Sequence, residues 1–262
     1  MYKVLFILSL FIVGPSNLHA DSPNFDVTAS LLNFGYEEFS TTGRSLNRET
    51  GFLPGVKLRY YYKMDNLLIL PLLSLYEGRV DYIGSTQSGQ PHTTQTIESI
   101  TSYGLDILIN QSTRHLKTLI GFRNWRWDRD ILTRNGILGL HELYSWTELI
   151  MGVRVTTDNI DSSFYAGNFS LIYIINPKMK VFLPNSSETL TLGEKPGVRL
   201  SFGKKWIFTK TDLDLTLYVE YWEFGRSNSV FTNDFFGNSA LITEPDSKSL
   251  HRGIELTYSS YF

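Results

Sequence analysis

The last twelve residues of the chain, from His251 to Phe262, alternate apolar and polar side chains with a period of two. Side chains of a β-strand point alternately to its two sides, so this pattern predicts a strand with one apolar and one polar face. Only Ser260 interrupts the apolar face. That face consists of Ile254, Leu256, Tyr258, Ser260 and Phe262.

The same alternation recurs along the chain. It is clear in seven upstream segments, at residues 25–31, 56–63, 97–110, 142–155, 165–175, 198–203 and 212–221. Two further segments, 67–82 and 117–130, alternate less cleanly, and the first is apolar on both faces around Pro71. Because proline cannot donate a ladder hydrogen bond, we expect a β-bulge there that exchanges the two faces. The sequence therefore predicts ten strands.

The connections between these strands alternate in length. Short turns are expected near residues 64–66, 111–115, 158–159 and 209–210, and longer polar loops at 40–50, 84–95, 131–140, 177–195 and 227–250. Short turns at one end and long loops at the other, with an even strand number, are typical of a transmembrane barrel. We predict an all-β fold, a single antiparallel up-and-down transmembrane β-barrel of ten strands. The alternative of twelve would need short segments within 231–243 to cross twice.

The first twenty residues have the features of a secretory signal peptide. Lys3 precedes an apolar run from Val4 to Val13, and a polar stretch ends at Ala20. The run of about ten residues is much shorter than the roughly 20 that a membrane-spanning helix needs. We expect cleavage after Ala20, which leaves residues 21–262 as one β-barrel domain.

The composition excludes several other classes of protein. The chain has 24 basic and 26 acidic residues, and no block of like charge, so no nucleic acid partner is expected. It has no cysteine, which excludes a disulfide framework and a thiolate metal site. There is no metal-ligand spacing and no phosphate-binding glycine loop, so we predict no metal and no cofactor. The charged content of 19% fits a barrel, whose strands alternate lipid-facing with inward polar residues.

Through the signal peptide, the ten amphipathic strands and the terminal aromatic residue, the chain resembles the outer-membrane β-barrel proteins of Gram-negative bacteria. The resemblance covers residues 21–262 and identifies no single family. It implies an outer-membrane location at the cell surface, in contact with membrane lipid and lipopolysaccharide. It also implies that Tyr258 and Phe262 form the signal that the barrel-assembly machinery recognises, although Ser260 stands where an aromatic residue is usual.

Aromatic and charged residues gather at the predicted outer ends of four strands, at 36–39, 76–79, 125–128 and 221–224. Trp and Tyr favour the membrane interface, so one interpretation is a structural aromatic girdle. The other is a binding rim that stacks on sugars or holds lipopolysaccharide phosphates by charge-assisted contacts. Arg129 would be a further phosphate contact. The candidate rim residues are Arg79, Arg123, Trp125, Arg126, Trp127 and Trp222.

Ten strands is also the size of the omptin proteases, which place two acidic residues, and an Asp beside a His, on the external rim. Hydrolysis needs a base near a nucleophile or a pair of acids. This chain has no Asp–Asp or Asp–His doublet, and its weak catalytic candidates are Asp128, His141 and His251. A surface hydrolase is therefore an alternative function.

The predicted inward positions carry charges of both signs, such as Arg59, Asp106 and Glu255. In so narrow a barrel, side chains fill the lumen, and paired charges are the expected interior. A narrow, porin-like channel is a further alternative.

The main prediction is a structural or surface-interaction barrel, whose rim and loops contact lipopolysaccharide, a ligand or a host factor. The sequence leaves the oligomeric state open.

Overall fold

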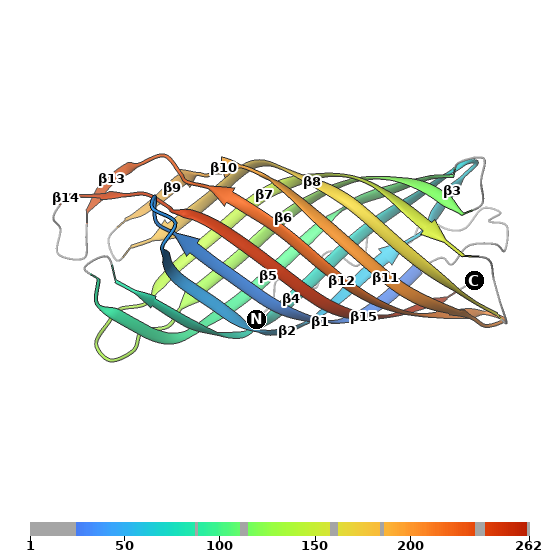
Figure 1. Ribbon diagram of the computed structural model, residues 1–262, viewed down its shortest axis with the longest axis horizontal. Helices are drawn as coiled ribbons and strands as arrows, with labels where there is room; N and C mark the ends of the chain where they lie inside the picture. Colours follow the sequence, from blue (N-terminus) through green and yellow to red (C-terminus); the bar gives the residue numbers. More distant parts are fainter. Residues whose placement is uncertain are drawn as a thin grey trace.

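The computed structural model describes residues 25–86, 89–110, 115–157, 162–183, 186–233 and 239–260. Within these ranges, ten long strands form one antiparallel barrel (Figure 1). No helix in this part of the chain is long and apolar enough to cross a membrane. The predicted signal peptide and Phe262 lie outside the described residues. The strands, in their order around the barrel, are β1 (Phe25–Phe39), β2 (Ser45–Tyr60), β4 (Leu67–Ser85), β5 (Pro91–Asn110), β6 (Leu116–Ile131), β7 (Leu140–Thr156), β8 (Ser163–Phe182), β11 (Pro196–Ile207), β12 (Thr211–Gly225) and β15 (Asp246–Ser260).

The last strand closes the barrel, as the sequence predicts. On one side β15 pairs with β12, from Thr211 opposite Ser260, and on the other it pairs with β1, from Phe25 opposite Ser260. Every one of the ten barrel strands therefore has two antiparallel neighbours, so the barrel wall is closed. The ten-strand prediction is confirmed over the twelve-strand alternative.

The two faces of the wall differ in polarity. Along β12, for example, Leu213 and Leu217 point outward, whereas Asp212 and Glu220 are buried in the lumen. Outward residues of all ten strands form a broad apolar band of the kind that faces lipid. Exposed members of this band include Leu31, Phe52, Tyr103, Phe122, Met151, Leu171, Phe202, Leu217, Ile254 and Leu256.

The strands run further toward the long-loop end than the sequence indicates. β2 already begins at Ser45 and β15 at Asp246, inside segments expected to be loops. There both faces of the wall are polar or charged, as with outward Arg48 beside inward Glu49. Because the apolar alternation ends with the lipid band, the pattern in the sequence stops before the strand does.

The bulge expected at Pro71 is absent. β4 pairs with β5 in one continuous register, with Pro71 opposite Leu105. This prediction is wrong because the inward neighbours of the proline, such as Leu70, are themselves apolar. β4 is apolar on both faces at this point, and its side chains keep the same sides of the wall before and after Pro71.

An irregularity that the sequence analysis did not predict occurs on β8. Its register against β7 shifts by one residue between Ser145 and Thr147. On β8 the extra residue is Asn176, which has a positive φ of 52°, a conformation that Asn tolerates better than most residues. Glu194 stabilises it by accepting a hydrogen bond from the Asn176 backbone N–H at 2.9 Å. Beyond Asn176 the inward and outward positions of β8 are exchanged.

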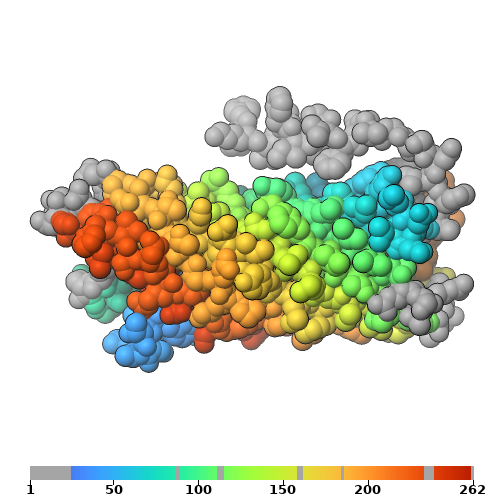
Figure 2. Space-filling view, turned by 90° about the horizontal axis from the view of Figure 1, so that it is seen from above, coloured from blue at the N-terminus to red at the C-terminus, as the bar shows by residue number. Residues whose placement is uncertain are grey.

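Additional short strands extend the long-loop end, including β9 (Ser187–Thr191), β10 (Gly193–Glu194), β13 (Val230–Asn233) and β14 (Ser239–Ile242). β9 continues the sheet beside β8, inside the segment 177–195 that was expected to be a loop. The β13–β14 hairpin projects at the same end as the turn between β1 and β2 (Figure 2). β3 (Tyr62–Met64) lies in a turn at the opposite end. By the rule for such barrels, the long loops are external and the short turns periplasmic.

We expect Leu217→Arg to lower the free energy of unfolding by roughly 2–4 kcal/mol, the cost of placing Arg at the lipid midplane. Leu217 faces outward between Phe202 and Ile254, both in the apolar band. Urea unfolding in liposomes measures the effect. Leu241→Arg is the matched control, since Leu241 is similarly exposed on the β13–β14 hairpin, and it should change stability little. Equal effects of both substitutions would contradict the assigned facing.

Candidate functional site

The lumen at the external end is closed by a group of aromatic side chains, here called the aromatic layer. It consists of Trp127 on β6, Tyr144 and Trp146 on β7, and Trp222 and Phe224 on β12, each at most 5% exposed. The rings are in contact: those of Trp127 and Tyr144 stack at 4.7 Å, and those of Trp146 and Trp222 lie 5.3 Å apart. Aromatic packing therefore fills the barrel from one wall to the other.

The buried guanidinium group of Arg129 lies beside this layer. The guanidinium group of Arg129 contacts carboxylates from three strands, with N–O distances of 3.1 Å to Glu38, 3.1 Å to Glu49 and 2.5 Å to Glu142. The Arg129 side chain is only 1% exposed. Removing one partner of such a buried group typically costs about 3–5 kcal/mol, because the remaining charge is uncompensated. Arg129 thus ties β1, β2 and β7 to β6.

The loop residue Glu244 covers the aromatic layer from the external side. Glu244, between β14 and β15, is buried and accepts hydrogen bonds from Tyr144 at 2.7 Å and Tyr36 at 3.3 Å. Its backbone N–H also bonds to the Ser227 hydroxyl at 2.8 Å. Burial, together with the nearby negative charge of Glu38, raises the pKa of the Glu244 carboxyl well above its usual value. The β13–β14 hairpin is in this way anchored inside the barrel mouth.

We expect Glu244→Gln to make the protein less sensitive to pH. Because the pKa of Glu244 is raised on folding, its stabilising contribution is present below the ordinary Glu pKa and is lost as pH rises through the folded-state pKa. The amide oxygen of Gln can still accept both tyrosine hydrogen bonds without carrying charge. The variant should therefore be more stable than the original protein at alkaline pH. Urea midpoints across pH measure this, and Glu223→Gln on the outer wall is the control.

The predicted rim residues do not form one surface. Arg79 and Arg126 point outward and are exposed. Trp127 and Trp222 belong to the buried aromatic layer, and Trp125 stacks on Trp146 at 5.5 Å inside the lumen. Arg123 also lies inside, with both of its hydrogen bonds going to Asp106. Neighbouring residues of a strand face opposite sides, so a run such as 125–128 is divided between lumen and outer wall.

Arg126 has outward neighbours that the sequence analysis missed. Lys178 lies in the same cross-strand row, separated from Arg126 by Ser145 of β7, and Lys180 is one outward position further along β8. The side chain of Arg126 is 64% exposed. We call Arg126, Lys178 and Lys180 the outer cationic strip. Only the bulge at Asn176 turns both lysines outward, and the one signal for it in the sequence is the Asn176-Pro177 pair, which marks an irregularity.

Of the three catalytic candidates, Asp128 and His141 are in contact and His251 lies apart from them. Nε2 of His141 lies 2.8 Å from a carboxylate oxygen of Asp128 on the outer wall, and the imidazole stacks on Phe182. Both polar side chains are more than a third exposed, on an open surface. His251 is instead buried in the lumen, packed against Trp222. Within the described residues, no Ser, Thr or Tyr hydroxyl is hydrogen-bonded to the His141 imidazole.

No protein-family model matches the chain, and no curated protein matches its sequence. Its structure is similar to that of the outer membrane protease OmpT from Escherichia coli, with a TM-score of 0.58 and 9% identity over 92% of this chain and 98% of OmpT. It also matches the transport unit of the autotransporter AIDA-I from Escherichia coli, with a TM-score of 0.48 and 8% identity over 97% and 94% of the two chains. At these identities the likeness is one of fold. The chain has the fold of outer-membrane β-barrels.

Proposed function

We propose that this protein is a cell-surface barrel of the bacterial outer membrane, and that its outer cationic strip binds the phosphate groups of lipopolysaccharide. The observation that carries the proposal is the position of the strip just above the lipid band. Arg126 follows the band residue Phe122 by four residues on β6, or about 14 Å along the strand. Phosphate groups of the lipid headgroups lie at such a level, immediately outside the hydrocarbon region.

The chemistry of the strip suits phosphate. Arg and Lys donate charge-assisted hydrogen bonds to phosphate oxygens. Arg126 lies 3.8 Å from Asp128, too far for a hydrogen bond, and the Lys180 ammonium lies over the Phe182 ring, 4.9 Å from its centroid. The donors of the strip are therefore available to an external anion. Arg79 is exposed two strands away, beside Ile97 of β5, and offers a further contact on the same wall.

The closed lumen supports a task at the surface over conduction. The aromatic layer, Arg129 and its carboxylates fill the external half of the barrel, and Glu244 covers them. A hydrolase is less well supported, since the His141–Asp128 pair lies on the outer wall with both side chains more than a third exposed.

Reversing two charges of the strip, as in Arg126→Glu/Lys178→Glu, should weaken binding of lipid A by at least about tenfold, or ~1.4 kcal/mol. Binding is measured in detergent micelles with lipid A that carries its phosphates and with lipid A from which they have been removed. The matched control is Lys63→Glu/Lys210→Glu, which reverses two exposed charges at the short-turn end. Equal affinity for both forms of lipid A would refute the proposal.

Purified protein should produce no conductance steps in planar lipid bilayers, because the buried rings of the aromatic layer fill the lumen at its external end. An open porin in the same bilayers serves as the positive control. Regular, voltage-stable steps from this protein would restore the channel interpretation.

A further inference from the structure

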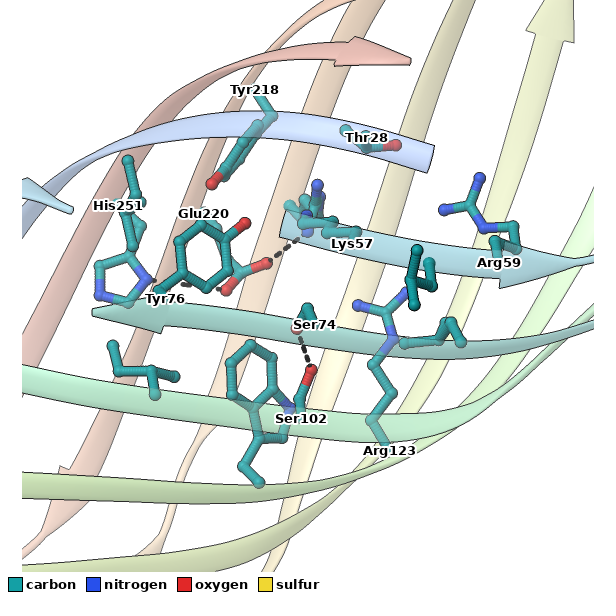
Figure 3. A pocket seen from close by; sticks show the side chains of 16 residues that line it. Thr28, Lys57, Arg59, Ser74, Tyr76, Ser102, Arg123, Tyr218, Glu220 and His251 are labelled. Atoms are coloured by element: carbon teal, nitrogen blue, oxygen red, sulfur yellow. Dashed lines mark hydrogen bonds and ion pairs between the residues drawn. The ribbon is translucent and has the colours of Figure 1, made fainter. Parts of the chain in front are cut away.

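Two cavities lie in the lumen on the periplasmic side of the aromatic layer. The one nearer the layer, of about 50 Å³, is lined by Ser74, Ser102 and His251 among others, with Arg59 and Arg123 at the end opposite His251 (Figure 3). The other, of about 130 Å³, extends toward the short-turn end. Arg59, Arg123 and Arg199 line both cavities. The aromatic layer leaves the periplasmic end as the route into this space.

The carboxylates of the larger cavity already have partners. Asp106 accepts two hydrogen bonds from Arg123. Glu255 forms ion pairs with Lys57 at 2.6 Å and Arg199 at 3.1 Å. Asp26 accepts a hydrogen bond from Tyr61, and Asp214 accepts one from Thr216. Each of these four acids thus has a partner within the wall, and among their oxygens Oδ1 of Asp26 is buried without one in the described part of the chain.

The basic side chains of the cavity include hydrogen-bond donors without a partner within the described ranges. Nε of Arg59 and Nε of Arg123 are buried, and neither atom has a hydrogen-bond partner among the described residues. The closest contact of Arg59 with Asp26 is 3.6 Å, longer than a hydrogen bond. An unsatisfied buried donor is unfavourable, and an arginine donor next to a cavity suits an acceptor that occupies that cavity.

Two further cations face each other where the cavity approaches the periplasm. Lys117 of β6 and Arg154 of β7 are direct cross-strand partners, and both occupy inward positions. In the part of the chain that the structure describes, neither forms an ion pair. Lys205 is a further cation near Lys117, although it is paired with Asp212 at 2.6 Å. Like charges directly opposite one another destabilise a sheet, and a bound anion would relieve the repulsion.

We propose that the larger cavity binds a small oxyanion of the phosphate class, which enters from the periplasm past Lys117 and Arg154. Arg154 lines the cavity, and Arg59 and Arg123 hold the anion from its inner end. The volume of about 130 Å³ is that of roughly four water molecules at ~30 Å³ each, which suits a five-atom tetrahedral anion. The site lies inside the barrel, at the opposite end from the outer cationic strip, and is independent of the proposed lipopolysaccharide contact.

Isothermal titration of the whole protein in detergent micelles tests this proposal, with inorganic phosphate as the probe and ionic strength held constant with chloride. We expect saturable binding of phosphate that Arg154→Gln and Lys117→Gln each weaken by about tenfold, whereas Arg154→Lys keeps most of the affinity. Arg48→Gln, which removes one exposed charge at the external end outside the outer cationic strip, should leave binding unchanged. A phosphomonoester, glycerol phosphate, is titrated in parallel.

The outcomes separate the sources of the anion. Binding of inorganic phosphate alone supports a free oxyanion, and equal binding of glycerol phosphate supports a phosphate group carried by a larger periplasmic molecule. Absence of binding at millimolar phosphate would overturn the proposal. So would binding that is the same in Arg154→Gln and Lys117→Gln as in the original protein. Heat-modifiable mobility on detergent gels shows in each case that the variant has folded.

Discussion

Closure between β1 and β15 is the constraint on which the rest of the structure depends. A sheet in lipid cannot leave an edge unpaired, since no water is present to satisfy its backbone N–H and C=O groups. The register from Phe25 opposite Ser260 to Phe39 opposite Asp246 meets this requirement along the whole length of both strands. Closure also fixes the two faces of every strand. Leucine and aromatic side chains on the outside then meet lipid, and whatever is inside must fill a narrow lumen.

The lumen is filled in two different ways. In the external half, aromatic rings pack against one another, and Arg129 gathers three carboxylates at a position almost without solvent. A buried ion group of this kind is weak evidence for net stability, but it strongly disfavours any arrangement that separates its members. In the periplasmic half, arginines and acids are spread around the wall, and cavities remain between them. The external half of the barrel is thus filled by side chains, whereas the periplasmic half keeps internal space.

Because the external half of the lumen is filled, we propose functions for the outer cationic strip and for the periplasmic cavity, and not for a pore. The outer wall above the lipid band carries the exposed cations, where headgroup phosphates would meet them. The periplasmic cavity carries Arg154 and Lys117, whose mutual repulsion has no compensating acid among the described residues. Neither surface needs the aromatic layer to open. Folds of this class support unrelated tasks, so the tasks proposed here rest on the side chains of the two sites and not on the likeness to OmpT.

The sequence by itself determined the strands, their number and their closure. Alternation of apolar and polar residues with a period of two follows directly from strand geometry and is present wherever one face meets lipid. It could also place Leu217 outward and Glu220 inward. It could not determine where the strands end, since above the band both faces are polar, as at Arg48 and Glu49. Strand geometry implies that the neighbours Trp127 and Arg126 face opposite sides of the wall, but residues 117–130 alternate too weakly to show which of the two faces the lumen. Only the tertiary structure placed Arg126 and Lys178 in one row on the outer wall, because that arrangement depends on cross-strand register and on one extra residue at Asn176 that reverses the facing of β8.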